Sequence, residues 1–240
     1  FGVDYMAAMV LSAVVIVGYT IMGGFRAVST TDLIQSVVMS MALIAVLVYG
    51  VNVAGGWDVV LDNARSLPGY LTMAASHNAA DNAATSYSLL DIASTLAWGL
   101  GYFGQPHILV RFMATRSIKV IPNARRVATL WMSFCLSGAV AVGFFGAAFF
   151  AEHRDVASLV EQNHERVFIV LSGLLFNPWI AGILMSAILA AVMSTLSCQL
   201  LVCSSTLTED FYRTFIRRNA SQRELVWFGR SMVLLVSVVA

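Results

Sequence analysis

The residues that could do chemistry lie in two short stretches, each in the middle of a long apolar run. The first stretch, WGLGYFGQP, places Gly99, Gly101 and Gly104 shortly before Pro106. Each glycine costs a helix about 1 kcal/mol relative to alanine, and proline removes a backbone hydrogen bond. We therefore predict a helix that is broken inside the membrane. Such a break survives only where protein, water or a ligand satisfies the freed backbone groups.

Trp98, Tyr102 and Pro106 follow one another at intervals of four residues. They therefore share one face for as long as the helix lasts. Two aromatic rings and a pyrrolidine ring form an apolar, shape-selective wall, and the N–H groups freed by the break could hold an anionic group. The sequence predicts a small-molecule site here. The alternative is that the glycines serve close helix packing and the aromatic rings pack as core.

The second stretch, AVMSTLS, places two adjacent hydroxyl groups, Ser194 and Thr195, near the middle of its apolar run. The carbonyl group of Ala191, three residues before Ser194, lies on the same helix face. A monovalent cation stripped of water needs several such oxygens, so the cluster is a candidate ion site. By themselves the residues favour the alternative, in which each hydroxyl donates to a carbonyl of the preceding turn.

The composition of the chain predicts that membrane-spanning helices hold these two stretches. Of the 240 residues, 59% are hydrophobic and 11% are charged, whereas soluble proteins have about 45–50% and about 25%. The apolar residues form uncharged runs near the length of about 20 residues that crosses a bilayer as a helix. We expect an all-α, polytopic transmembrane helical bundle over residues 1–240, with about six spans at 5–22, 33–53, 92–110, 127–151, 179–208 and 225–240.

The fifth apolar run is too long for one straight span, and Asn177-Pro178 divides it. Proline disfavours helix at the residue before it and suits the first turn of the helix after it. We predict a short outer-loop helix at about residues 167–176 and a long tilted span after Pro178.

The positive charges give the chain an orientation. Cytoplasmic loops carry an excess of Lys and Arg. One alternation of the loops places 11 of the 14 Lys and Arg residues inside. This orientation puts residue 1 on the outer side of the membrane.

Asp32 follows Thr30 and Thr31 at the start of the second expected span. A hydroxyl or carboxylate group there can accept hydrogen bonds from the free N–H groups of a helix start. We predict that Thr30 or Thr31, with Asp32, caps this helix. A functional carboxylate is the other interpretation of Asp32.

Several function classes are excluded by what the sequence does not contain. A net charge of +1 gives no field for binding nucleic acid. The three cysteines lie in apolar runs, as buried small hydrophobes do. No phosphate-binding glycine loop, nucleophile triad or metal motif is present, so we expect neither an enzyme nor an ATP-driven pump, and no cofactor.

Two long segments resemble the sodium/solute symporter family. They are WGLGYFGQPHILVRF at 98–112 and FNPWIAGILMSAILAAVMSTLSCQLLVCSS at 176–205. Residues 19–32 and 124–150 agree further, and the loop at 55–88 departs most. The resemblance implies part of an inverted-repeat, leucine-transporter-like fold, an internal fragment whose missing transmembrane helices belong to the same protein.

The resemblance also implies a function and its site residues. It implies Na+-coupled symport of L-proline across the bacterial cytoplasmic (inner) membrane, with Na+ as the coupling ion. By the resemblance, Trp98, Tyr102 and Pro106 would contact the proline substrate. The carbonyl of Ala191 and the hydroxyls of Ser194 and Thr195 would hold sodium. Asp32 matches a family carboxylate associated with sodium-dependent transport. Two alternatives stay open: a symporter for another small amino acid or carboxylate, and a transporter-like sensor domain of a histidine kinase.

Overall fold

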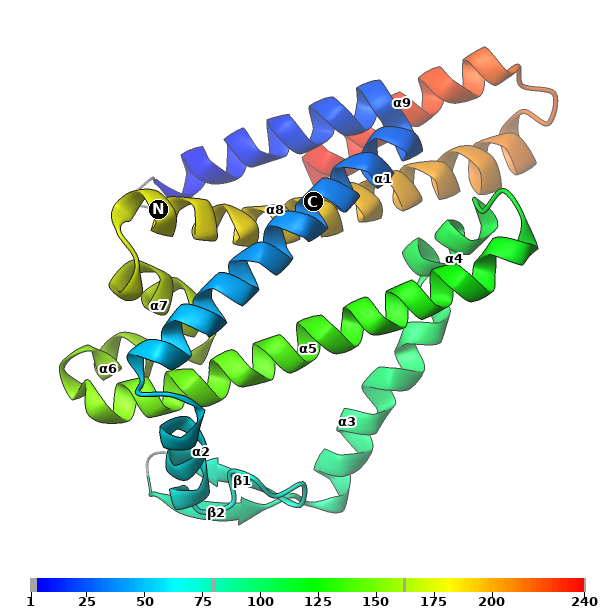
Figure 1. The fold of residues 1–240 in the computed structure, drawn as a ribbon. Helices are drawn as coiled ribbons and strands as arrows, with labels where there is room; N and C mark the ends of the chain where they lie inside the picture. Colours follow the sequence, from blue (N-terminus) through cyan, green and yellow to red (C-terminus); the bar gives the residue numbers. More distant parts are fainter. Residues whose placement is uncertain (1–3, 79–80, 162, 240) are drawn as a thin grey trace. The chain divides into compact units, whose positions relative to one another are not determined.

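The structure of the chain, a computed structural model, describes residues 4–78, 81–161 and 163–239. It is mostly helical, as the apolar runs predict (Figure 1). The chain divides into two compact units, each assembled from separate segments. Unit 1 comprises Phe1–Met39, Pro106–Ala114 and Ala187–Ala240, and unit 2 comprises Ser40–Gln105 and Thr115–Ser186.

Short connections join the helices and the two strands along the chain. In chain order they are α1 (Tyr5–Val53), α2 (Trp57–Ser66), β1 (Ala75–Asn78), β2 (Ala83–Ser86), α3 (Leu89–Gly101), the 3₁₀ turn η1 (Tyr102–Gly104), α4 (Pro106–Met113), the 3₁₀ turn η2 (Ile118–Val120), α5 (Ile121–Glu152), α6 (Arg154–Glu161), the 3₁₀ turn η3 (His164–Arg166), α7 (Val167–Leu175), α8 (Pro178–Ser205), the π-helical segment η4 (Thr206–Ile216) and α9 (Gln222–Val239).

Three helical stretches among the described residues are long and apolar enough to cross a membrane: Met6–Val53, Ile118–Glu152 and Pro178–Ile216. The first has 48 residues. A straight helix of that length would reach about 72 Å, more than twice a hydrocarbon core of about 30 Å. That all six predicted runs cross the bilayer stays a prediction.

Helix α1 contains the first two predicted spans and is broken between them at Gly24. This residue has φ 53° and ψ −149°, a backbone conformation outside the helical region. Side chains with a Cβ rarely adopt it, so a glycine is required here. Figure 1 shows the chain turning back at this point. The break therefore produces two helical arms from one nearly continuous helix.

The predicted cap at Thr30, Thr31 and Asp32 is wrong. The second arm of α1 begins directly after Gly24, so these residues lie inside the helix and not at its start. The hydroxyl of Thr31 donates to the carbonyls of Ala27 at 3.0 Å and Val28 at 2.9 Å. Each hydroxyl is satisfied by the preceding turn, which is the usual arrangement of threonine inside a helix. Asp32 is thus free of a capping role.

The break predicted in the third run is present. Helix α3 ends at Gly101, a single 3₁₀ turn follows, and α4 starts at Pro106. Gln105 between them is extended, with φ −74° and ψ 116°. An extended residue is what the following proline imposes.

Asn177-Pro178 separates α7 from α8, as predicted. Phe176 is extended, and Pro178 is the first residue of α8. The side-chain oxygen of Asn177 accepts a hydrogen bond from the backbone N–H of Ile180 at 3.0 Å. Asparagine before a helix and proline in its first turn together satisfy and shape a helix start.

Unit 2 packs around the middle of α5. The side chain of Phe145 is fully buried, and a Cβ added at Gly50 of α1 would overlap its ring. Leu171 of α7 is also fully buried, next to Gly146 of α5. Small residues here let the helices approach closely, as is common in membrane bundles.

The loop between α2 and α3 contains the one departure from an all-α chain that the described residues show. Strands β1 and β2 pair antiparallel, with Ala75 opposite Ser86 and Asn78 opposite Ala83. His77 contacts the carbonyl of Pro68 through Nδ1 at 3.0 Å. A loop rich in Asn, Ala and Ser gave no alternation of apolar and polar residues from which strands could be predicted.

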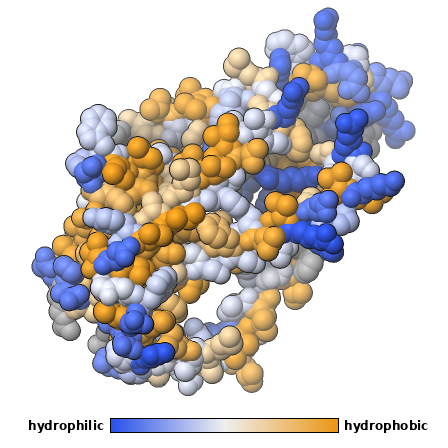
Figure 2. All heavy atoms as spheres, viewed as in Figure 1, coloured by the Kyte–Doolittle hydropathy of each residue, from blue (hydrophilic) through white to orange (hydrophobic). Residues whose placement is uncertain are grey.

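The surface of the chain is strongly apolar. Figure 2 shows hydrophobic side chains over much of the visible face, with hydrophilic ones gathered in separate clusters. Many large apolar side chains are exposed, among them Leu11, Leu33, Leu130 and Ile183. A soluble monomer rarely exposes apolar surface on this scale, whereas lipid or neighbouring helices cover it in a membrane protein.

Candidate functional site

In unit 1, the oxygens of the candidate ion site come together on one face of α8. Ser194 Oγ donates to the carbonyl of Ala191 at 2.9 Å, and Thr195 Oγ1 donates to the same carbonyl at 3.1 Å. Three oxygens therefore lie within one helical turn, with the two hydroxyls beside each other. This is also the back-bonded arrangement of the alternative interpretation, so the role of these oxygens in holding sodium stays a prediction.

The chemistry of the cluster follows from how these bonds use lone pairs. A hydroxyl donates its one proton and keeps its lone pairs, while a carbonyl oxygen has two. The Ala191 carbonyl already accepts two hydroxyl protons. Each hydroxyl must turn its proton away for that carbonyl to face a cation, and both hydroxyls then face the cation with lone pairs.

Helix α1 contacts α8 next to these oxygens, within unit 1. The Tyr19 hydroxyl donates to the backbone carbonyl of Met193 at 3.3 Å. Ser197 is fully buried and donates to the carbonyl of Ser194 at 3.1 Å. Neither Tyr19 nor Ser197 was singled out from the sequence as a candidate residue. The position of Ser197 in the same stretch, one turn beyond Ser194, is a signal that could have indicated it.

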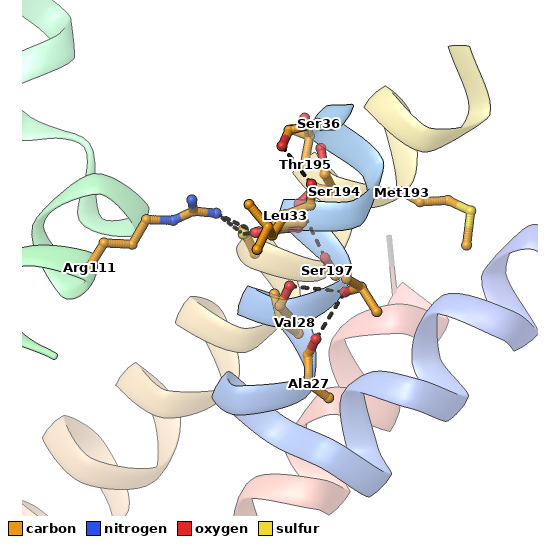
Figure 3. A network of polar contacts seen from close by, with 12 residues as sticks. Ala27, Val28, Leu33, Ser36, Arg111, Met193, Ser194, Thr195 and Ser197 are labelled. Carbon is orange, nitrogen blue, oxygen red and sulfur yellow. Dashed lines mark hydrogen bonds and ion pairs between the residues drawn. The ribbon is translucent and has the colours of Figure 1, made fainter. Parts of the chain in front are cut away.

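Asp32 forms an ion pair with Arg111 in the same unit. The distance from Arg111 Nη2 to Asp32 Oδ2 is 2.6 Å. Figure 3 shows Arg111 reaching from α4 toward α1 and α8. The Asp32 side chain is 13% exposed and that of Arg111 53%. A carboxylate in the interior of an apolar helix is thus neutralised by a cation from another helix.

Cys198 of α8 completes this cluster. Arg111 Nη2 also donates to Cys198 Sγ at 2.6 Å, and Cys198 Sγ donates to Asp32 Oδ2 at 3.3 Å. The other carboxylate oxygen, Asp32 Oδ1, is buried and has no hydrogen-bond partner among the described residues. From the sequence, Arg111 counts among the positive charges assigned to the cytoplasmic side and Cys198 among the small hydrophobes of the apolar runs, so neither was predicted as a site residue.

A small cavity of about 10 Å³ adjoins the cluster within unit 1. Its lining includes Arg111, Cys198, His107 and Ser29. This volume is close to the minimum that holds one water molecule. The walls combine polar groups with the apolar side chains of Phe25 and Leu201.

The predicted aromatic wall is present in unit 2 as a ring pair. The ring centroids of Trp98 and Tyr102 lie 5.2 Å apart, at an interplanar angle of 58°. Trp98 is 73% exposed and Tyr102 38%. The two rings share a face, as their spacing predicts. Pro106 begins α4 and belongs to unit 1, and the role of all three in binding stays a prediction.

The glycines of the break stand in open surroundings. A Cβ built on Gly99, Gly101 or Gly104 meets no other atom within 4 Å in the part of the chain that the structure describes. Close helix packing by these glycines is therefore not seen here. Their open environment agrees with a role in breaking the helix, where low helix propensity counts and not small size.

Comparison with known proteins assigns the sequence to a family. The sequence model of the sodium:solute symporter family matches residues 1–240. The chain belongs to the sodium:solute symporter family. Membership confirms the resemblance seen in the two long motifs, and it assigns the chain to transporters and not to enzymes.

Curated members of the sodium:solute symporter family are similar along the whole chain. The sodium/proline symporter of Escherichia coli (strain K12) is 52% identical over 248 residues, which cover 100% of this chain and 46% of that protein. The sodium/proline symporter of Haemophilus influenzae is 49% identical and that of Staphylococcus aureus 43%, again over the full chain. The chain spans a little under half the length of these relatives.

A solved structure of a sodium-coupled symporter has the same fold. A Na+-coupled sialic acid symporter, in a substrate-bound outward-open state, superimposes with a TM-score of 0.76 at 21% sequence identity. The match covers 99% of this chain and 50% of that protein. At this identity the likeness establishes the fold alone. It confirms the helical membrane-transporter fold that the motifs implied.

Proposed function

We propose that the complete gene product containing these residues carries out sodium-coupled uptake of L-proline across the bacterial cytoplasmic membrane. One observation carries the proposal: sodium/proline symporters from three bacteria are 43–52% identical over the full chain. That span includes both stretches in which the residues predicted chemistry. Na+ is the coupling ion, and proline and Na+ are the transported partners.

The candidate ion site gives sodium uncharged oxygens. The Ala191 carbonyl and the Ser194 and Thr195 hydroxyls supply three ligands from one face of α8. Neutral oxygens compensate for lost hydration without binding the ion too tightly for release. Further ligands have to come from other helices, because three oxygens do not complete the shell of a sodium ion.

The ring pair supports a substrate of the shape of proline. Trp98 and Tyr102 offer an apolar surface on which a pyrrolidine ring can lie. After the break, the start of α4 at Pro106 leaves backbone N–H groups that can donate to a carboxylate. An aliphatic ring next to a carboxylate is complementary to this combination of aromatic and backbone groups.

Symport follows from binding that favours one facing state. Sodium shifts the transporter toward a state only by as much as its affinities for the two states differ. One charge that crosses a potential of about 100 mV provides about 2.3 kcal/mol, which corresponds to roughly 50-fold accumulation of substrate. This free energy is sufficient for uptake against a gradient.

Uptake of labelled proline into proteoliposomes that contain the complete gene product tests the proposal. An inward sodium gradient should stimulate uptake, and potassium in its place should not. Unlabelled proline should compete, while other small amino acids and carboxylates should compete weakly. Strong competition by one of these would transfer the function to that substrate. Sodium-independent proline binding without uptake would instead favour a sensor.

The orientation can be tested separately. We propose that residue 1 lies on the outer side, because this places the Arg-rich segment from Arg213 to Arg230 in the cytoplasm. A single cysteine introduced in the β1–β2 hairpin should react with a membrane-impermeant maleimide in intact cells. The same label should reach a cysteine placed at Arg218 only after the cells are opened.

A further inference from the structure

The contacts between α1, α4 and α8 in unit 1 meet at one charge pair. Asp32 belongs to α1, Arg111 to α4 and Cys198 to α8, and each of the three contacts the other two. Arg111 follows the broken helix by a few residues, and Cys198 lies one turn beyond Ser194. Through Cys198, this cluster joins the helix after the broken segment to the helix that carries the candidate sodium ligands.

The geometry of the pair is one-sided. Arg111 contacts only Oδ2 of the carboxylate, while Oδ1 is buried without a hydrogen-bond partner among the described residues. Arginine and carboxylate groups frequently pair through two parallel N–H groups, one to each oxygen. Here a single Nη2 is divided between the carboxylate and the Cys198 sulfur.

The two partners of the ion pair differ in burial, so they differ in the cost of losing the other charge. Asp32 is the buried group, and Arg111 is half exposed. When a buried charge pair loses one partner, the remaining buried charge bears the desolvation penalty. The loss of Arg111 would leave the Asp32 carboxylate without its ion-pair partner among apolar helices. It would also remove the contact that holds α4 against Cys198 of α8.

We propose that Arg111 is a positioning residue of sodium-coupled transport, which fixes Asp32 and ties α4 to the sodium-carrying turn of α8. This inference rests on the proposed function, since it assigns Arg111 a part in sodium coupling. The tether keeps the helix after the break in register with the hydroxyls of α8. Arg111 acts through Asp32 and Cys198 and touches neither the ion nor the substrate.

Removal of each charge, singly and together, tests the tether in the complete gene product. Arg111→Gln should raise the sodium concentration for half-maximal proline uptake by about tenfold or more. Its KM for proline at saturating sodium should change much less. Arg111→Lys should recover part of the sodium affinity, because it keeps the charge but not the divided contact.

A double-mutant cycle distinguishes a pair from two independent residues. Asp32→Asn with Arg111→Gln should be no worse than the more damaging single variant, because the second change removes a group whose partner is already gone. Exchange of the charges, with Asp32→Arg and Arg111→Asp together, should restore part of the sodium-stimulated uptake. Additive losses in the cycle would overturn the proposal.

The controls separate this inference from the proposed function. Arg116→Gln changes an exposed arginine just after α4 and should leave sodium dependence unaltered. If the unmodified protein shows no sodium-stimulated uptake, the proposed function fails. If it does, and Arg111→Gln matches it, the tether fails. Should a single variant not reach the membrane, the charge exchange decides: recovery supports the tether, and no recovery overturns it.

Discussion

The rings of Trp98 and Tyr102 lie 5.2 Å apart, centroid to centroid, across the end of α3. The pair sits where the helical ladder gives way to a 3₁₀ turn. A tilted ring pair at this distance is mutually attractive, so each ring helps to hold the other in place. The ring pair thus presents an exposed aromatic surface at the break in the helix.

Loss of either ring should weaken substrate binding more than sodium binding. Trp98→Ala or Tyr102→Ala removes one half of the wall, and we expect the KM for proline to rise about tenfold, the equivalent of about 1.4 kcal/mol. Uptake measured over a range of proline concentrations at saturating sodium gives this value. Leu96→Ala, on the same helix and also exposed, should have little effect. An equal rise in that control would assign the loss to α3 as a whole.

The two hydroxyls of α8 should govern the sodium requirement. Ser194→Ala and Thr195→Ala each remove one candidate ligand, so the sodium concentration for half-maximal uptake should rise about tenfold or more in each. Ser186→Ala is the matched control, because that hydroxyl also donates to a carbonyl of the preceding turn, that of Ile183, at 2.6 Å. If all three variants behave alike, the hydroxyls serve only the helix, as the alternative interpretation holds.

Gly50 is a test of the packing in unit 2. Gly50→Ala would place a Cβ on the buried ring of Phe145, and overpacking of this kind costs about 1–3 kcal/mol. The thermal unfolding midpoint of the purified protein in detergent should fall. Phe145→Leu in the same chain should restore part of the loss. Gly143→Ala, whose Cβ meets nothing within 4 Å, should leave the midpoint unchanged, and a comparable fall there would contradict the packing argument.

The connection between η4 and α9 should make stability depend on pH. The Tyr212 hydroxyl donates to Glu224 Oε1 at 2.7 Å, and Arg217 Nη1 pairs with the same oxygen at 2.7 Å. The hydrogen bond from Tyr212, and after it the charge of Arg217, lower the pKa of Glu224. A lowered pKa contributes stability that is complete above the ordinary carboxyl range and is lost as the pH falls through the folded-state pKa.

Tyr212→Phe removes the larger cause of that lowered pKa. The unfolding midpoint of the variant should lie below that of the unmodified protein at neutral pH. The difference should shrink as the pH falls below the ordinary glutamate pKa of about 4 and on through the lowered pKa of Glu224. Tyr87→Phe makes the same change at an exposed tyrosine of another loop and should show no such dependence. A constant difference from pH 7 to pH 3.5 would exclude Glu224 as the titrating group.

Local sequence signals predicted the helix breaks because the physical cause lies in the residues themselves. Pro106 and Pro178 each disfavour helix at the residue before them, and the helix is interrupted before both. The hydroxyl cluster was likewise predictable, since a spacing of three or four residues on one helix fixes which groups meet. The fold class followed from composition and from the length of the apolar runs.

Other features depend on contacts that no local pattern encodes. Asp32 and Arg111 are 79 residues apart, and Cys198 is a further 87 residues along the chain. Only the tertiary arrangement brings them together. The predicted cap at Thr30 and Thr31 was wrong because the second arm of α1 already begins after Gly24, six residues before Thr30. That glycine had already provided the break.

Gly24 shows that a residue can be required for its backbone conformation alone. No atom lies within 4 Å of a Cβ built there, yet its φ of 53° strains any side chain. Its intolerance of substitution would therefore be invisible to any reasoning from crowding or lost contacts. The two arms of α1 therefore depend on a glycine whose substitution the backbone conformation alone would oppose.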